Sequence, residues 1–172
     1  MTDELAITIP SCDMTEPRRA NSGASLTLRP MKSLTTDPAS NPRRVLIVDD
    51  NEDAAELTRM YAEMRGHGAR VAYDAQSALA VADEFHPEVA VVDLHLGGDS
   101  GFILAQQLRA IPGLEGCRLV AVSGLPRSVA EAGAQAAGVT FYRHVTKPFG
   151  REEFFHAIES EDADAAGGSA AG

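Results

Sequence analysis

Five residues of this chain are of the types that handle phosphate and divalent cations, and each stands at or just beyond the end of a short apolar run. They are Asp49, Asp50, Asp93, Ser123 and Lys147. If folding gathers the three carboxylates, two like charges about 4 Å apart repel by roughly 4 kcal/mol at an effective dielectric of 20. The lysine relieves part of this excess. A hard cation relieves the rest, and Mg²⁺ typically takes one or two carboxylates, waters and a phosphate oxygen. The set therefore predicts a Mg²⁺ site shaped to receive phosphate.

The apolar runs themselves predict the strands that must position these residues. Residues 45–48, 89–92 and 119–122 are continuous and rich in valine and other aliphatic side chains, without polar alternation. Such runs are typical of parallel strands that are buried on both faces of a sheet. Residues 69–73 and 140–145 are weaker strand candidates, as expected nearer the edges of a sheet.

Apolar residues at helical spacing lie between the strand candidates. In the first helix Ala54, Leu57, Tyr61 and Met64 recur at this spacing. Asp74 is expected to cap the second helix and Ser100 the third. The fourth and fifth helices are expected at about 127–137 and 151–158.

Five successive strand–helix units predict an α/β fold, a doubly wound five-stranded parallel sheet with helices on both faces. We expect the flavodoxin-like strand order 2-1-3-4-5, in which ligands bind at the carboxyl ends of the strands. In that order strands 1, 3, 4 and 5 are neighbours, so the polar residues that follow them converge on one crevice.

Four motifs, in this order and spacing, carry a resemblance to a known family. VLIVDDNEDA, VVDLHLGGDSGF, VAVSG and TKPF resemble the receiver domain of bacterial two-component response regulators. The resemblance covers nearly all of residues 43–158. No single motif is specific, but the ordered set of four at successive strand ends is a strong signal.

The resemblance implies a role for each matching position. Asp93 is the expected phosphoacceptor, a carboxylate that becomes an acyl phosphate. Asp50 is expected to bind Mg²⁺ directly and Asp49 mainly through water. Asp93 and the backbone carbonyl of His95 are expected to complete the ligands. The lysine at 147 is expected to contact a phosphoryl oxygen.

Two further positions are expected to carry the switch. By the same resemblance, Ser123 is expected to move and hydrogen-bond the phosphoryl group once it is present. His144 lies three residues before Lys147, where receivers usually place an aromatic switch residue. His95 would flank the entrance to the phosphate site and is a candidate for tuning hydrolysis. Gly97 stands where the family usually has proline, so we expect a more flexible loop after Asp93.

The resemblance also implies partners. The phosphoryl donor is expected to be a phosphohistidine on a histidine kinase or a phosphotransfer protein, and the output a downstream protein target, with a homodimer possible. Catalysis is expected to be limited to the receiver's own phosphorylation and dephosphorylation, so we do not expect an enzyme in the ordinary sense. The longer stretch before Lys147 leaves the register of the fifth strand open.

Composition bounds the remaining functions. A formal charge of −10 argues against nucleic-acid binding, and no apolar stretch approaches the roughly 18 residues of a membrane span. Cys12 and Cys117 form no CxxC motif and are interpreted as ordinary thiols of a cytoplasmic protein. Residues 1–42, rich in Ser, Thr, Pro and Asn, are expected to be a disordered arm. Residues 159–172 are expected to be a disordered acidic and Ala/Gly tail.

Other interpretations remain beside the main one. An aspartyl phosphatase would use Asp93 with a second aspartate two residues later, where this chain has His95. A flavin or dinucleotide binder would place a Gly- or Ser/Thr-rich loop after the first strand, where this chain has acids. A pseudo-receiver adaptor would typically lack the acceptor or the lysine. The segment after Ile158 is shorter than the ~40 residues that fold unaided, so we expect a stand-alone receiver. A fragment of a hybrid histidine kinase is the alternative.

Overall fold

The computed structural model describes residues 41–161. The expected arm and tail therefore lie almost entirely outside the described residues. The elements of the described part are β1 (Arg44–Val48), α1 (Glu52–Met64), β2 (Gly68–Ala72), α2 (Ala75–Phe85), β3 (Val89–Asp93), β4 (His95–Leu96), β5 (Asp99–Ser100), α3 (Gly101–Arg109), β6 (Arg118–Ser123), α4 (Arg127–Ala136), β7 (Arg143–Thr146) and α5 (Arg151–Glu159).

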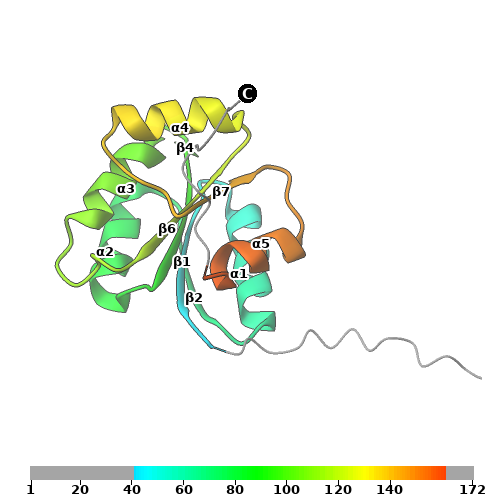
Figure 1. Cartoon of the computed structure of the whole chain (residues 1–172). Helices are drawn as coiled ribbons and strands as arrows, with labels where there is room; N and C mark the ends of the chain where they lie inside the picture. The colour runs from blue at the N-terminus through cyan, green and yellow to red at the C-terminus, as the bar shows by residue number, and fades with distance from the viewer. Residues whose placement is uncertain (1–40, 162–172) are drawn as a thin grey trace, which may run out of the picture. The chain divides into compact units, whose positions relative to one another are not determined.

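The sheet confirms the expected topology. Five parallel strands lie in the order β2-β1-β3-β6-β7, which is the predicted 2-1-3-4-5 arrangement (Figure 1). The short strands β4 and β5 form a separate antiparallel pair that the sequence pattern did not predict. The open question of the last strand is answered by its pairing, in which Val120 lies opposite Arg143 and Ala121 opposite His144. The strand begins three residues later than expected.

Helices cover both faces of this sheet (Figure 1). A hydrophobic core lies on each face, and the strands contribute side chains to both. Along β1, Val45 and Ile47 pack in the core with α1 and α5, whereas Leu46 and Val48 pack in the core with α2 and α3. Because alternate side chains of each central strand are buried on opposite faces, the strand must be apolar at every position. This explains the continuous apolar runs in the sequence.

Local signals fix several helix ends. The side chain of Asn51 accepts a hydrogen bond from the Ala54 amide and caps α1. Asp74 caps α2 as expected, accepting from the Ser77 amide at 2.7 Å. Ser100 lies at the N-cap position of α3, but its side chain makes no capping hydrogen bond there. The expected N-cap position of Ser100 is confirmed, but the capping hydrogen bond is not, and the backbone of Ser100 also belongs to the β4–β5 pair.

The buried face of α1 differs from the apolar spacing seen in the sequence. The buried residues are the small side chains Ala55, Thr58 and Ala62, whereas Leu57 and Met64 are each 48% exposed. Small residues let the helix approach the sheet closely, and the hydroxyl of Thr58 is satisfied by donating to the Ala54 carbonyl. Leu57 and Met64 are left toward solvent, whereas Tyr61 is partly buried and packs against the core.

Two expectations about the chain as a whole can be compared with the described residues. Within residues 41–161 no helix has the length and apolar character that crossing a membrane requires. Cys117 is a buried free thiol, and burial raises its pKa to about 11. At that pKa it is protonated and unreactive near neutral pH. Cys12 lies outside the described residues.

Candidate functional site

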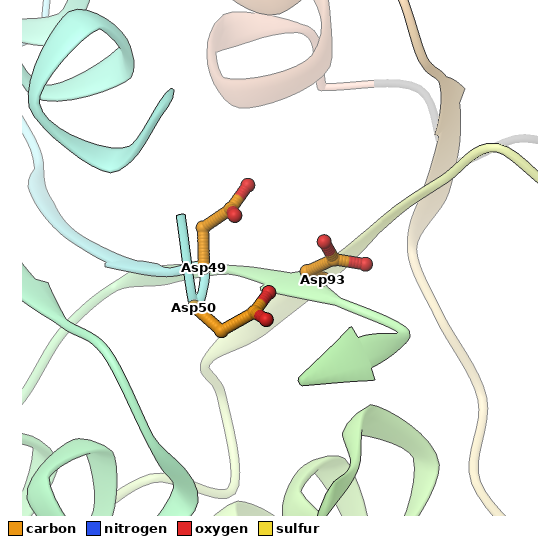
Figure 2. A group of neighbouring side chains, drawn as sticks. All are labelled: Asp49, Asp50 and Asp93. Atoms are coloured by element: carbon orange, nitrogen blue, oxygen red, sulfur yellow. The ribbon is translucent and has the colours of Figure 1, made fainter. Parts of the chain in front are cut away.

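Three carboxylates meet at the carboxyl ends of β1 and β3. Asp49 and Asp50 follow β1, and Asp93 is the last residue of β3, the neighbouring strand. One oxygen from each of the three carboxylates lies within 4.8 Å of the others (Figure 2). Asp49 and Asp93 are buried, whereas Asp50 is exposed. The predicted convergence of these three residues is therefore what the structure shows.

Lys147 reaches the cluster from the segment that follows β7. Its ammonium nitrogen donates to Oδ2 of Asp49 and to Oδ2 of Asp93, each at 2.6 Å. Partial burial would lower the pKa of Lys147, but the hydrogen bonds and charges of the two carboxylates outweigh it and raise the pKa above its ordinary value. Lys147 is therefore a permanent cation shared by two buried acids.

Backbone groups hold the two buried carboxylates in place. The His95 amide donates to Oδ1 of Asp93 at 2.8 Å, and the Asn51 amide donates to Oδ1 of Asp49 at 3.0 Å. In both Asp49 and Asp93, Oδ1 accepts from a backbone amide and Oδ2 accepts from Lys147, so both oxygens of each carboxylate are engaged. Within the described residues no hydrogen bond or ion pair reaches the carboxylate of Asp50. This carboxylate is therefore free to bind a cation.

The donor set fits a hard divalent cation. Three carboxylates with oxygens this close, matched by a single lysine, leave an excess of negative charge, and oxygen ligands are what Mg²⁺ and Ca²⁺ select. The amide of His95 lies within hydrogen-bonding distance of Asp93, which places the backbone of His95 beside the cluster. That its carbonyl is a ligand stays a prediction.

Ser123 and His144 lie side by side one strand away from the acceptor. Ser123 ends β6, whose Val122 is paired with Asp93, and its side chain is buried. Its hydroxyl accepts from the Leu125 amide at 3.1 Å and lies 3.3 Å from Nε2 of His144. His144 in turn lines a cavity of about 470 Å³ between α4 and the sheet, with Ala121, Ala130, Ala134 and Phe141 among the other lining residues.

Some features of the site were not predicted from the sequence. A second hollow, of about 440 Å³, adjoins Asp49 and Lys147 and is lined also by Leu57, Tyr61 and Phe149. The β4–β5 pair follows the acceptor directly and carries His95, whose side chain is exposed. The signal for the pair was the Gly97–Gly98 sequence, a common turn of short hairpins. The hollow had no such signal, because its lining comes from two segments far apart in the sequence, residues 49–61 and 147–149.

Comparisons with known proteins agree with this geometry. The sequence profile of the response regulator receiver domain matches residues 45–159. The probable transcriptional regulatory protein TcrX of Mycobacterium tuberculosis is 36% identical over 113 residues, which are 65% of this chain and 46% of that protein. The regulatory protein VanR of Enterococcus faecium is 26% identical, with 69% of this chain and 49% of that protein covered. The chain thus spans about half the length of these relatives.

Solved structures show the same fold. The chemotaxis protein CheY4 of Vibrio cholerae superposes with a TM-score of 0.62 at 21% identity, covering 67% of this chain and 94% of that one. A response regulator from Burkholderia pseudomallei, solved with a phosphorylated aspartic acid, a calcium ion and citrate, has a TM-score of 0.61 at 29% identity, covering 69% of this chain and 67% of that one. The family profile spans well over half of the sequence and includes every residue of the acidic site. The chain therefore belongs to the response regulator receiver domains of two-component systems.

Proposed function

We propose that Asp93 accepts a phosphoryl group from a phosphohistidine on a histidine kinase or a phosphotransfer protein, with Mg²⁺ bound at the acidic cluster. The phosphorylated domain then signals by protein contact or passes its phosphoryl group onward. The observation that carries this proposal is the convergence of Asp49, Asp50 and Asp93, of which Asp49 and Asp93 share one lysine. Receiver domains interact with histidine kinases and downstream targets, and as a family they are not enzymes in the ordinary sense.

The chemistry needs a nucleophile and charge compensation. A carboxylate oxygen of Asp93 attacks the phosphorus, the P–N bond to the donor imidazole breaks, and an acyl phosphate remains on Asp93. In-line phosphoryl transfer depends mainly on positioning and charge neutralisation, so no separate acid or base is required. The His95 amide and Lys147 already orient the carboxylate of Asp93 before the donor arrives.

The cluster supplies two kinds of positive charge to the transferred group. Asp49, Asp50, Asp93 and the His95 carbonyl would hold Mg²⁺, which when bound neutralises charge on the phosphoryl oxygens. Lys147, shared between Asp49 and Asp93, is placed to turn toward a phosphoryl oxygen on Asp93. The Burkholderia pseudomallei regulator, whose structure holds a phosphorylated aspartic acid and a calcium ion, supports this arrangement by similarity.

The switch would run through Ser123 and His144. The Ser123 hydroxyl is held by the Leu125 amide and lies beside His144. When it turns to donate to a phosphoryl oxygen, His144 loses this neighbour and can move into the cavity beneath α4, whose lining includes the small side chains of Ala121, Ala130 and Ala134. Phosphorylation would thereby change the surface formed by α4 and β7, where a downstream protein or a second copy of the chain can bind.

The second hollow supports a protein donor. It opens beside Asp49 and Lys147, and apolar side chains of α1 and the β7–α5 connection line it. Leu57, Met60 and Met64 are exposed along the same helix. An apolar surface next to an acidic site suits a partner that must be held while its phosphohistidine reaches Asp93.

The test is phosphorylation by a small donor. Incubation with acetyl phosphate and Mg²⁺ should add one phosphoryl group, measured by intact mass, and Asp93→Asn should abolish the addition. EDTA should also abolish it, because the acidic cluster then lacks its cation. A mass shift that persists in Asp93→Asn would place the acceptor elsewhere, and labelling unchanged by EDTA would refute the metal's role. A phosphotransfer profile against the host's histidine kinases would then identify the donor.

A further inference from the structure

The chain between β3 and α3 forms a closed loop, in which two short strands pair. We call residues 94–101 the acceptor loop. Within it β4 and β5 pair antiparallel, with His95 opposite Ser100 and Leu96 opposite Asp99. Gly97 and Gly98 form the turn, and Gly97 has a φ of +56°, a conformation that residues with a side chain rarely adopt. The end of the loop therefore lies beside its beginning, next to Leu94.

Gly101 closes the loop directly against the acceptor. It is the first residue of α3, it is buried, and its amide donates to the Leu94 carbonyl at 3.2 Å. A Cβ at this position would lie 2.1 Å from the carbonyl oxygen of Asp93 and 2.7 Å from Cα of Leu94. These are backbone atoms, which cannot rotate away as the end of a side chain can. Any side chain here must separate α3 from the Asp93–Leu94 peptide or displace that peptide.

That peptide governs the geometry of the site. It leads from Asp93 to His95, whose amide binds Oδ1 of Asp93 and whose carbonyl is the expected metal ligand. The tip of the loop also lies near the cluster, since a Cβ on Gly97 would be in van der Waals contact with Oδ2 of Asp50, at 3.4 Å. Two glycines thus lie beside the site: Gly101, at the base of the loop, lies against the backbone carbonyl of Asp93, and Gly97, at its tip, lies near the carboxylate of Asp50.

We propose that Gly101 is a positioning residue for phosphoryl transfer, and that Gly97 is a second one at the tip of the same loop. Gly101, by having no side chain, lets the acceptor loop close against the backbone of Asp93, and Gly97 supplies the positive φ of the turn. Together they fix the carboxylate of Asp93, the carbonyl of His95 and the carboxylate of Asp50 relative to one another. This inference rests on the proposed function. Misplacing a reacting group by about 1 Å can cost roughly 100-fold in rate.

Three matched glycine variants test the base of the loop. Gly101→Ala introduces a clash with the backbone of Asp93, whereas Gly133→Ala, in α4, introduces one of 2.5 Å with the Phe102 ring. Gly116→Ala meets nothing within 4 Å. For each we would measure the rate of labelling by acetyl phosphate over a range of Mg²⁺ concentrations, together with the melting temperature.

We expect Gly101→Ala to label about 10- to 100-fold more slowly and to need more Mg²⁺ for half-maximal rate. Gly133→Ala should keep both values close to wild type even if its melting temperature falls, and Gly116→Ala should match wild type throughout. The dependence on Mg²⁺ separates positioning from stability, because a folded protein that is merely less stable keeps its metal ligands in place. A folded Gly101→Ala with wild-type rate and Mg²⁺ dependence would overturn the inference.

The tip of the loop gives an independent test if Gly101→Ala does not fold. Gly97→Ala and Gly98→Ala are adjacent in the same exposed turn, but only Gly97 has a positive φ and lies near Asp50, while a Cβ on Gly98 meets nothing within 4 Å. We expect labelling to slow several-fold in Gly97→Ala and to stay at the wild-type rate in Gly98→Ala. Equal rates in the two variants would overturn the role of the loop. A wild-type protein that is never labelled would instead refute the proposed function, and this inference with it.

Discussion

The two ends of the central sheet both gather charged residues, but they balance them differently. At the carboxyl ends of the strands, Asp49 and Asp93 share Lys147, and the neighbouring carboxylate of Asp50 has no hydrogen bond or ion pair within the described residues. At the amino ends, four arginines surround the end of α5. We call them the arginine collar: Arg43, Arg65, Arg118 and Arg143.

The collar is held by groups at the end of α5. The buried Arg43 donates to the carbonyls of Ile158 and Glu159, at 3.0 and 3.3 Å, and so satisfies carbonyls at the end of α5. The guanidinium of Arg65 binds both carboxylate oxygens of Glu159, and the buried His67 lies 3.1 Å from the same group. Cations near a helix C-terminus also interact favourably with its dipole.

The two ends of the sheet have different roles: the collar contributes to the stability of the fold, and the acidic cluster is the candidate functional site. The side chains of the collar are held by the fold itself, through carbonyls and carboxylates at and just after the end of α5. The acidic cluster has three carboxylates to one lysine and an open carboxylate on Asp50, so it would gain free energy if a cation bound. The same sheet thus has charges engaged within the fold at one end and an incomplete site at the other.

Removing Lys147 should produce the largest loss of stability, because the acidic cluster then has no positive charge of its own. Lys147→Met keeps the length of the side chain but leaves Asp49 and Asp93 unpaired, so we expect the free energy of unfolding in EDTA to fall by about 2 kcal/mol. This is less than for a fully buried pair, because the lysine is partly exposed. Mg²⁺ should recover much of the loss, since it replaces the missing cation. Urea unfolding with EDTA and with Mg²⁺ would measure both effects, and an equal loss in the two conditions would contradict the explanation.

Breaking the collar should destabilise the fold by a smaller amount and leave phosphorylation unchanged. We expect Glu159→Gln to cost about 1 kcal/mol, because Arg65 and His67 lose a charged partner in a partly buried setting. Glu84→Gln is the matched control, since it removes the exposed pair between Arg70 and Glu84 and should change stability little. A slower labelling rate in Glu159→Gln would show that the two ends of the sheet are coupled.

Lowering the pH should remove the contribution of Glu159 to the free energy of unfolding. The hydrogen bonds from Arg65, followed by that from His67, hold the pKa of Glu159 below its ordinary value of 4.5 despite partial burial. A carboxylate whose folded pKa is depressed stabilises the fold above its unfolded pKa, and this stability is lost as the pH falls through the folded pKa. Wild type should therefore lose its advantage over Glu159→Gln as the pH falls below about 4.5, while the difference persists at pH 7.

Sequence patterns predicted the carboxyl end of the sheet far better than the amino end. Asp49, Asp93 and Ser123 each follow a run whose apolar character identifies a buried strand, so their convergence follows from the strand order alone. The collar had no such signal, because Arg43 and Arg118 are ordinary charged residues until the end of α5 is placed between them. A charge run or a lone arginine is usually exposed, and only tertiary structure distinguishes the exceptions.

Short elements and glycines also escaped the sequence pattern. Strands β4 and β5 have two residues each, too few for any periodicity to appear. Gly101 could be recognised only once the backbone of Asp93 was known to lie against it, since a glycine carries no side chain whose type suggests a role. The rotation of α1 that buries Ala55, Thr58 and Ala62 was hidden because small residues can pack more closely than the larger apolar ones.

The smallest expected effect has the opposite sign and tests the comparison most directly. Asp50 is exposed and lies within 4.8 Å of two other carboxylates. Asp50→Asn should therefore relieve repulsion and raise the free energy of unfolding in EDTA by up to about 1 kcal/mol, as expected for charges about 4 Å apart in water. The stabilisation by Mg²⁺ should shrink at the same time, because a ligand is lost.

Asp53→Asn supplies the control for this substitution. Asp53 is also exposed but belongs to the first turn of α1, where a negative charge interacts favourably with the helix dipole. Its replacement should lower stability by about 0.3–1 kcal/mol and leave the response to Mg²⁺ unchanged. If Asp50→Asn lowered stability as Asp53→Asn does, the carboxyl end would not be short of positive charge. Repulsion among the three carboxylates would then not be the source of the free energy proposed to drive cation binding.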